Sequence, residues 1–207
     1  MSAAELSQEL SLALTELGFA ATPDQVAALL ALAQLVESWG QRMNLSGHRS
    51  ADDVVRRLIL DAAALLAVAP PFASVADLGS GAGFPGLPIA ILRPDIQVTL
   101  IDSRERRHHF QRAARRQLEL HNVHPLRGRL ETLTPAPHEA VLAQALAHPE
   151  QALPLMKPWA APSAHLLIPT TENGPLPASD ESLASTEIRS YQAPGGPRHR
   201  LWVAKLV

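Results

Sequence analysis

The chain contains no cysteine among its 207 residues. Disulfide bridges, thiolate metal sites and a cysteine nucleophile are therefore excluded. No apolar run reaches the roughly 20 residues that a membrane-spanning helix needs, and the acidic start, Met1 to Glu5, is not followed by a signal-peptide pattern. Apolar residues still make up 46% of the composition. We therefore expect a cytoplasmic protein with a packed core, built as one ordinary domain with a small appendage.

Lysine is almost as scarce, since Lys157 and Lys205 are the only two. The positive charge lies on arginine, and it is concentrated in the segment 103–129. This segment holds eight arginines and two glutamates, a net charge of about +6, whereas the whole chain carries −2. Arginine binds phosphate and the guanine edge through paired hydrogen bonds. The cluster therefore indicates a nucleic-acid partner, with a solvated helix face as the alternative.

Helix-type spacing of apolar residues dominates the first third of the chain. It predicts helices over about 3–17, 23–39 and 50–67, the second one starting at the cap and first-turn residues Thr22-Pro23-Asp24. The pair Pro70-Pro71 interrupts the chain. We therefore expect an N-terminal helical cap over residues 1–70 and a second unit over residues 71–207.

The second unit alternates strands with helices. Its expected strands lie at 74–78, 97–101 and 123–126, and its expected helices at 85–92 and 103–120. This alternation is typical of right-handed βαβ units on a parallel sheet. Further on, the pattern predicts a short helix at 151–156, a strand at 164–168, a loop at 169–184 and an antiparallel pair at 187–191 and 201–206. Residues 139–147 fit either a strand or a helix.

A glycine-rich stretch follows the first of these strands: Asp77-Leu78-Gly79-Ser80-Gly81-Ala82-Gly83-Phe84-Pro85-Gly86. Glycines let the backbone turn tightly and approach a ligand closely. The next strand ends in Asp102, which is placed to accept hydrogen bonds from ribose hydroxyls. The alternative role for Asp102 is to cap the following helix. Strand, glycine turn, helix and acid together predict a binding site for a nucleotide-type cofactor.

The loop fits two patterns. From Gly81 to Gly86 it matches the G-x-G-x-x-G of dinucleotide-binding proteins. From Asp77 it matches the acid-x-G-x-G-x-G loop of methyltransferases. Asp77 favours the second pattern, because an acid can hold the ammonium group of that cofactor but repels a pyrophosphate. Pro85 and Pro88 also stand where a dinucleotide fold needs close helix–strand packing. A purely structural turn is the third possibility.

Three stretches resemble the bacterial small-subunit ribosomal RNA guanine-N7 methyltransferase family, RsmG or GidB. Trp39 with Asn44-Leu45-Ser46 is similar to its W-N-x-x-x-N-L-T stretch, with Gly40 in place of the first Asn. The run from Arg57 to Asp61 is similar to its R-H-x-x-D-S helix, with Leu58 in place of His. The run from Asp77 to Pro88, DLGSGAGFPGLP, matches its signature almost letter for letter. The resemblance is good from about 35 to 131 and weak afterwards.

This resemblance implies an α/β fold: a Rossmann-like class I methyltransferase sheet, mostly parallel with an antiparallel C-terminal hairpin, and an N-terminal helical cap. It implies S-adenosylmethionine as cofactor, and methyl transfer to guanine N7 in 16S ribosomal RNA of the 30S subunit, by a monomer. The expected cofactor contacts are Asp77, Gly79, Gly81, Phe84, Asp102, Leu130, Glu131 and Gln144. The candidate catalytic residues are Asn44 and Arg57. The expected RNA contacts are Arg49, Arg106, Arg107, Arg112 and Arg116.

The sequence also departs from the family pattern at the far side of the expected site. Where the family has Ser-Arg-Ala, this chain has Ala143-Gln144-Ala145, and where it has Ala-Leu-Lys-Gly, the chain has Ile168-Pro169-Thr170 and its neighbours. An Arg and a Lys of the site thus become Gln144 and Pro169. The alternative function is therefore a catalytically weakened or non-catalytic relative that binds cofactor or RNA. We expect no metal site, because the histidines lack ligand spacing.

Overall fold

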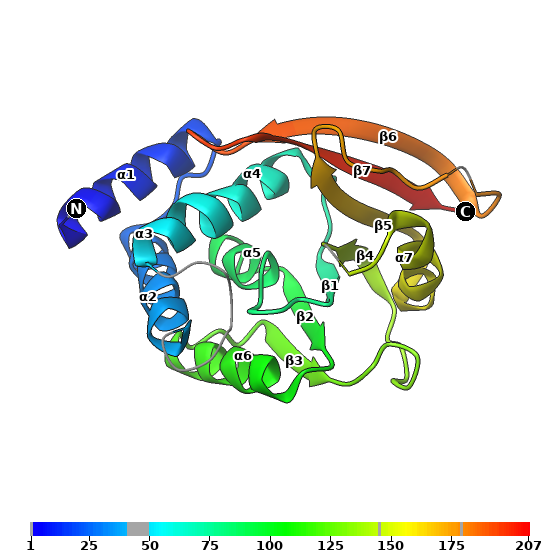
Figure 1. Cartoon of the computed structure of the whole chain (residues 1–207), viewed down its shortest axis with the longest axis horizontal. Helices are drawn as coiled ribbons and strands as arrows, with labels where there is room; N and C mark the ends of the chain where they lie inside the picture. The colour runs from blue at the N-terminus through cyan, green and yellow to red at the C-terminus, as the bar shows by residue number, and fades with distance from the viewer. Residues whose placement is uncertain (1, 41–49, 145, 179) are drawn as a thin grey trace.

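The computed structural model describes residues 2–40, 50–144, 146–178 and 180–207, and within these ranges the strands form one seven-stranded sheet (Figure 1). The strand order is β3-β2-β1-β4-β5-β7-β6, with the first five strands parallel and β7 antiparallel to both of its neighbours. The strands are β1 (Ser74–Leu78), β2 (Gln97–Asp102), β3 (Val123–Arg127), β4 (His138–Ala143), β5 (Ala160–Thr171), β6 (Leu183–Gln192) and β7 (Arg198–Leu206). The predicted parallel sheet with an antiparallel C-terminal pair is confirmed.

Most helices precede the sheet or connect its first strands. They are α1 (Ala3–Glu16), α2 (Pro23–Gly40), α3 (Ala51–Val54), the π-helical turn η1 (Val55–Ile59), α4 (Leu60–Val68), α5 (Gly86–Leu92), α6 (Glu105–Gln117), α7 (Pro149–Met156) and the 3-10 turn η2 (Lys157–Trp159). The predicted start of α2 is confirmed, because Thr22 Oγ1 accepts from the Gln25 N–H and Gln25 Oε1 accepts from the Thr22 N–H. No helix in the described part of the chain is both long and apolar enough to cross a membrane.

The two faces of the sheet carry unequal layers of helix (Figure 1). On one face, Val75, Val98 and Leu100 share a core with buried residues of α1, α2, α4, α5 and α6. On the other face, Ala76 and Ile101 pack with α7 and Trp159. Successive strand residues belong to opposite cores, as the two-residue period of a strand requires. The helical segment at the N-terminus therefore contributes to the same core as the sheet.

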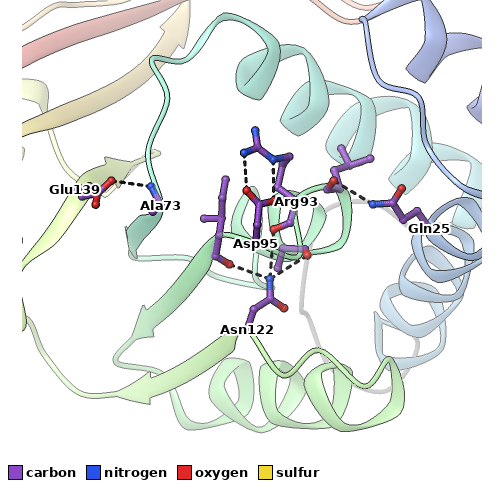
Figure 2. Close-up of polar contacts among 9 residues, drawn as sticks. Gln25, Ala73, Arg93, Asp95, Asn122 and Glu139 are labelled. Carbon is purple, nitrogen blue, oxygen red and sulfur yellow. Dashed lines mark hydrogen bonds and ion pairs between the residues drawn. The ribbon is translucent and has the colours of Figure 1, made fainter.

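Buried amides tie the connections at the end of the sheet opposite the glycine loop (Figure 2). Asn122 Nδ2 donates to the carbonyl oxygens of Ala90, at 3.1 Å, and Ile96, at 2.9 Å. Gln25 Nε2, from α2, donates to the carbonyl of Ile91 at the end of α5. The carbonyls of Ala90 and Ile91 are among those that the end of α5 leaves without helical partners, and Ile96 lies in the turn that follows.

Several element boundaries differ from the sequence prediction. Residues 139–147, whose pattern fits either a strand or a helix, contain most of the parallel strand β4. The strand β5 runs from Ala160 to Thr171 instead of 164–168. The prediction that all of 169–184 is a loop was therefore wrong at both ends, because 169–171 belong to β5 and 183–184 to β6. Pro169 is tolerated in β5 because it lies beyond Leu167, the last β5 residue paired with β4, so its missing N–H breaks no bond on that side.

Candidate functional site

The glycine loop connects β1 to α5, and its own backbone contacts fix its path. Six of its N–H groups donate to oxygens within the fold. The acceptors are Ile101 O for Gly79 and Ser80, Ser80 O for Gly83 and Phe84, Asp102 Oδ2 for Gly81, and Asp77 Oδ2 for Gly86. The glycines at 79, 81 and 83 have positive φ, which side-chain-bearing residues rarely adopt. The sequence therefore needs glycine here for backbone shape.

Asp77 lies behind the loop, with its side chain fully buried. Its Oδ2 accepts from the Gly86 N–H at 3.0 Å, and its Oδ1 has no hydrogen-bond partner among the described residues. Burial, opposed by the Gly86 bond and reinforced by nearby Asp102, raises the pKa of Asp77 to about 8. A Cβ at Gly86 would meet Leu100 and Asp77 Oδ2, so this glycine is needed for close packing.

These contacts decide between the two loop patterns. A dinucleotide loop offers free N–H groups at a helix N-terminus to a pyrophosphate. Here the N–H of Gly86, the first residue of α5, already donates to a buried carboxyl group. A pyrophosphate would lose that donor and face the acid behind it. The structure therefore favours the methyltransferase pattern.

Asp102 stands at the carboxyl end of β2, facing the loop, with a side chain 4% exposed. Its Oδ2 accepts from Gly81 N–H at 3.0 Å and from Arg107 Nη1 at 3.1 Å, and its Oδ1 accepts from Arg104 N–H at 2.8 Å. A carboxylate has about four acceptor positions. Asp102 therefore keeps room for a hydroxyl donor while being held rigidly by the loop.

A cavity of about 500 Å³ opens beside Asp102, at the carboxyl ends of β1, β2 and β3. We call it the loop cavity. Its lining residues are Gly79, Ile101, Asp102, Ser103, Arg104, Arg107, Gly128, Arg129, Leu130, Glu131, Leu146 and Leu155. Such an edge position is where open α/β sheets bind their ligands.

The loop cavity brings together half of the expected cofactor contacts: Gly79, Asp102, Leu130 and Glu131 line it. The other expected contacts lie elsewhere. Asp77 is buried behind the loop, Gly81 donates to Asp102, and Phe84 packs on the core beneath. Gln144 lines a second cavity, described below.

The second cavity, of about 290 Å³, is lined like the loop cavity by residues that follow β4, and we call it the hairpin cavity. Its lining residues are Ala143, Gln144, Ala147, Pro149, Ala152, Ile168, Pro169, Thr170, Thr171, Pro175, Tyr191 and His199. Gln144 and Pro169, the two departures from the family pattern at the far side of the expected site, are among them.

The structure places the candidate catalytic and RNA-binding residues apart. Asn44 and Arg49 lie outside the described residues. Arg57 is exposed on η1, with its Nε 3.8 Å from Asp53, and it lines neither cavity. Arg107 binds Asp102 in the loop cavity. The remaining predicted RNA contacts, Arg106, Arg112 and Arg116, are exposed on α6.

The α6 surface also carries a groove of about 710 Å³, which we call the α6 groove. Its lining residues are Trp39, His109, Arg112, Ala113, Arg115, Arg116, Glu119, Leu120 and His121. Arg112, Arg115 and Arg116 make no ion pair within the described ranges. Their charges are therefore available to a phosphate backbone.

Sequence reasoning missed three contributors to the site. Gln111, buried on α6, donates to Ser80 Oγ and to Gly81 O, so it supports the loop from beneath. The sequence feature that could have identified Gln111 is its position next to Phe110, on the buried side of an arginine-rich helix. Tyr191 and His199 enter the hairpin cavity from β6 and β7, and no local motif marks them.

Comparison with known proteins agrees with this geometry. The family model described as rRNA small subunit methyltransferase G matches residues 25–172. A ribosomal RNA small subunit methyltransferase G from Chromohalobacter salexigens is 32% identical over 193 residues, 91% of each chain. One from Xanthomonas axonopodis pv. citri is 36% identical over 189 residues, 86% of each chain.

A solved structure, TrmN from Thermus thermophilus, has a TM-score of 0.53 and 23% identity, covering 70% of this chain and 48% of that one. This likeness concerns the fold alone. Together with the strand order, it confirms the predicted class I methyltransferase sheet.

Proposed function

Because the chain belongs to the rRNA small subunit methyltransferase G family, we propose that it transfers a methyl group from S-adenosylmethionine to N7 of a guanine in 16S ribosomal RNA. The family predicted from the sequence is confirmed, and with it the class of enzyme, a methyltransferase of small-subunit ribosomal RNA. The guanine N7 atom is the part that we propose. The observation that carries the use of S-adenosylmethionine is the loop cavity, where the glycine loop and Asp102 meet.

The residues of the loop cavity fit the cofactor. S-adenosylmethionine, when bound, supplies a methyl group on a sulfonium. Asp102 has an acceptor position left for a ribose hydroxyl, and the positive-φ glycines keep the loop free of side chains. Asp77 lies buried directly behind this loop, with its Oδ1 unpartnered among the described residues, and lines neither cavity, so in the proposed set it acts through the loop that it holds at the Gly86 N–H. We propose Asp77, Gly79, Gly81, Phe84, Asp102, Leu130, Glu131 and Gln144 as the cofactor-binding set.

Guanine N7 has a lone pair and carries no proton, so its methylation needs no general base. The residues need to hold the base in line with the methyl group and to exclude water, and placement of this kind supplies much of a rate enhancement. Asn44 and Arg57 remain candidates for that placement. The reaction asks for no metal, and no cluster of three or more metal-ligating side chains exists within the described ranges.

A second candidate function is a weakened or non-catalytic relative, and Gln144 with Pro169 favours it. An arginine contact to a base is worth about 1–3 kcal/mol. Losing two such cationic contacts would slow the reaction by roughly 10²- to 10⁴-fold. The glycine loop and Asp102 oppose this alternative, since an unused site has no physical need for them.

Two measurements test the proposal. Calorimetry should show binding of S-adenosylmethionine and S-adenosylhomocysteine but not of NAD. Asp102→Asn should weaken that binding, whereas Asp95→Asn, an exposed partner of Arg93, should not. Radiolabelled methyl should then enter unmethylated 30S subunits or naked 16S RNA as 7-methylguanosine. Cofactor binding without any incorporation would leave the non-catalytic relative. Failure to bind either sulfur compound would refute the proposed function and leave only a relative that binds RNA.

We further infer that the protein acts in the cytoplasm as a monomer, with residues 1–70 as a helical cap on residues 71–207. Its ribosomal RNA substrate supports the location. Light scattering at working concentrations tests the monomer, and a dimer mass would contradict it.

A further inference from the structure

Residues that follow β4 line both cavities. Leu146 lines the loop cavity, whereas Gln144 and Ala147 line the hairpin cavity. Leu78 of β1 pairs with Ala143 of β4, so Gly79 and Gln144 follow directly from paired residues. A group bound in the hairpin cavity is therefore the neighbour of one bound in the loop cavity.

The hairpin cavity lacks the cations that the family pattern places there. Gln144 and Pro169 occupy those positions, and both line it. Among its described lining residues, His199 is the one side chain that can carry a positive charge. It comes from β7, far along the chain from the motif positions.

Two contacts fix the imidazole of His199. Its Nε2 lies 3.6 Å from Asp61 Oδ1, and its ring stacks on Tyr191 with centroids 5.4 Å apart and planes 25° apart. The His199 and Asp61 side chains are 21% and 16% exposed. Asp61 belongs to the Arg57–Asp61 motif, for which the loop cavity offers no role. With Nε2 turned to Asp61, Nδ1 is left for a ligand.

Building on the proposed function, we propose that the hairpin cavity binds the acceptor guanine and that His199 holds it through Nδ1, in place of the missing cations. The lining suits a base: Ala143, Ala152 and Ile168 are apolar, and Gln144 with Thr170 adds polar groups. Guanine O6 is an acceptor beside N7. A protonated imidazole donates from both nitrogens, whereas a neutral one with its proton on Nε2, toward Asp61, accepts at Nδ1.

Two titratable groups lie against the His199 imidazole, Asp61 on α4 and Tyr191 on β6. Burial raises the pKa of Asp61, and His199 opposes that rise. Burial also raises the pKa of Tyr191, which keeps its hydroxyl neutral. The adjacent Arg198 lies 3.9 Å from Glu172 and outside the cavity lining.

The test compares His199→Gln, which keeps a polar partner for Asp61 but removes the charge, with His199→Arg, a permanent cation. Arg198→Gln is the control for charge on the same strand. We expect His199→Gln to raise KM for 16S RNA about 5- to 150-fold, with cofactor Kd unchanged. His199→Arg, which keeps a cation at this position, should hold KM closer to the wild-type value than His199→Gln does. Arg198→Gln should match the wild type.

A second readout separates this inference from the proposed function. Guanosine 5′-monophosphate should shift the imidazole resonance of His199, identified by its loss in His199→Gln. If the wild type methylates RNA but His199→Gln keeps its KM, His199 does not hold the acceptor. If the wild type methylates no RNA, the proposed function fails. In that case a shift on nucleotide addition would still support the hairpin cavity as a guanine site, and no shift would overturn it.

Discussion

At the scale of single residues, the acid behind the glycine loop has a strongly raised pKa. Asp77 is buried, accepts one hydrogen bond from Gly86, and has a pKa raised to about 8. Between about pH 4 and pH 8 the folded protein therefore holds a proton that the unfolded chain releases. Stability falls with rising pH wherever the folded state binds more protons. This residue thus gives the loop a destabilising contribution at neutral and alkaline pH.

We predict that Asp77→Asn removes this dependence. Asn still offers an oxygen to the Gly86 N–H but cannot ionise. The free energy of unfolding of the wild type should fall relative to that of the variant as the pH rises from 5 to 8, with a slope difference approaching about 1.4 kcal/mol per pH unit. Urea unfolding at several pH values measures both free energies. Subtracting one from the other removes the contribution of groups that titrate in the same way in both proteins. Parallel stability curves for the two proteins would refute the assignment.

Residues differ in how well the sequence predicts them. Gly79 and Asp102 were placed at the cofactor site by local patterns, a strand followed by glycines and a strand ending in an acid, and both line the loop cavity. Arg107 was expected to contact RNA, yet its Nη1 binds Asp102. A helical periodicity cannot distinguish an arginine folded back onto its neighbour from one that faces solvent. His199 had no signal, because its partners Asp61 and Tyr191 come from other elements.

At the scale of elements, α5 depends on a residue outside it. Asn122 precedes β3, yet its amide satisfies carbonyls of Ala90 and Ile96 (Figure 2). We predict that Asn122→Ala lowers the free energy of unfolding by about 1–3 kcal/mol, because buried acceptors are left without donors. Asp95→Ala, which removes an exposed ion pair with Arg93, should cost only about 0–1 kcal/mol. Urea unfolding of both variants checks this, and equal costs would contradict it.

The α6 groove carries the second prediction at this scale. Reversing the charge of Arg112 and Arg116 should weaken RNA binding and lower the slope of log affinity against log salt by about two, one per phosphate contact. Filter binding at several salt concentrations measures the slope. Arg93→Glu is the control, because Arg93 lies in the turn between α5 and β2 and pairs with Asp95. An unchanged slope would make this surface an ordinary solvated helix face.

Elements also show where sequence patterns stop being informative. The apolar run in β4 fits a helix or a strand, and its parallel pairing with β1 and β5 decides the matter through distant partners. Near its ends, β5 contains Pro162 and Pro169, and proline usually predicts an interruption of a strand. They are accommodated since β5 pairs with β4 only over part of its length and continues against β7. Pairing between strands, rather than propensity, thus sets these boundaries.

At the scale of the whole molecule, the helical segment and the sheet share one core. Leu10 of α1 and Leu29 of α2 belong to the same cluster of buried residues as Val75 of β1 and Leu142 of β4. Trp39 of α2 also packs edge-on against Phe110 of α6, with ring centroids 5.5 Å apart. A division at residue 70 would therefore expose apolar surface on both sides, which costs free energy in proportion to the area exposed.

We predict that both parts unfold in one transition. In urea-dependent pulsed hydrogen exchange read by mass spectrometry, peptides from residues 3–40 and 74–143 should lose protection at the same urea concentration. Leu29→Ala opens a cavity in the shared core and should lower the free energy of unfolding by about 2–5 kcal/mol. Because the core is common, the midpoint should fall equally for both sets of peptides, although the substitution lies in α2. Loss of protection in the helical peptides alone, with the sheet still protected, would instead establish the cap as a separately folding unit.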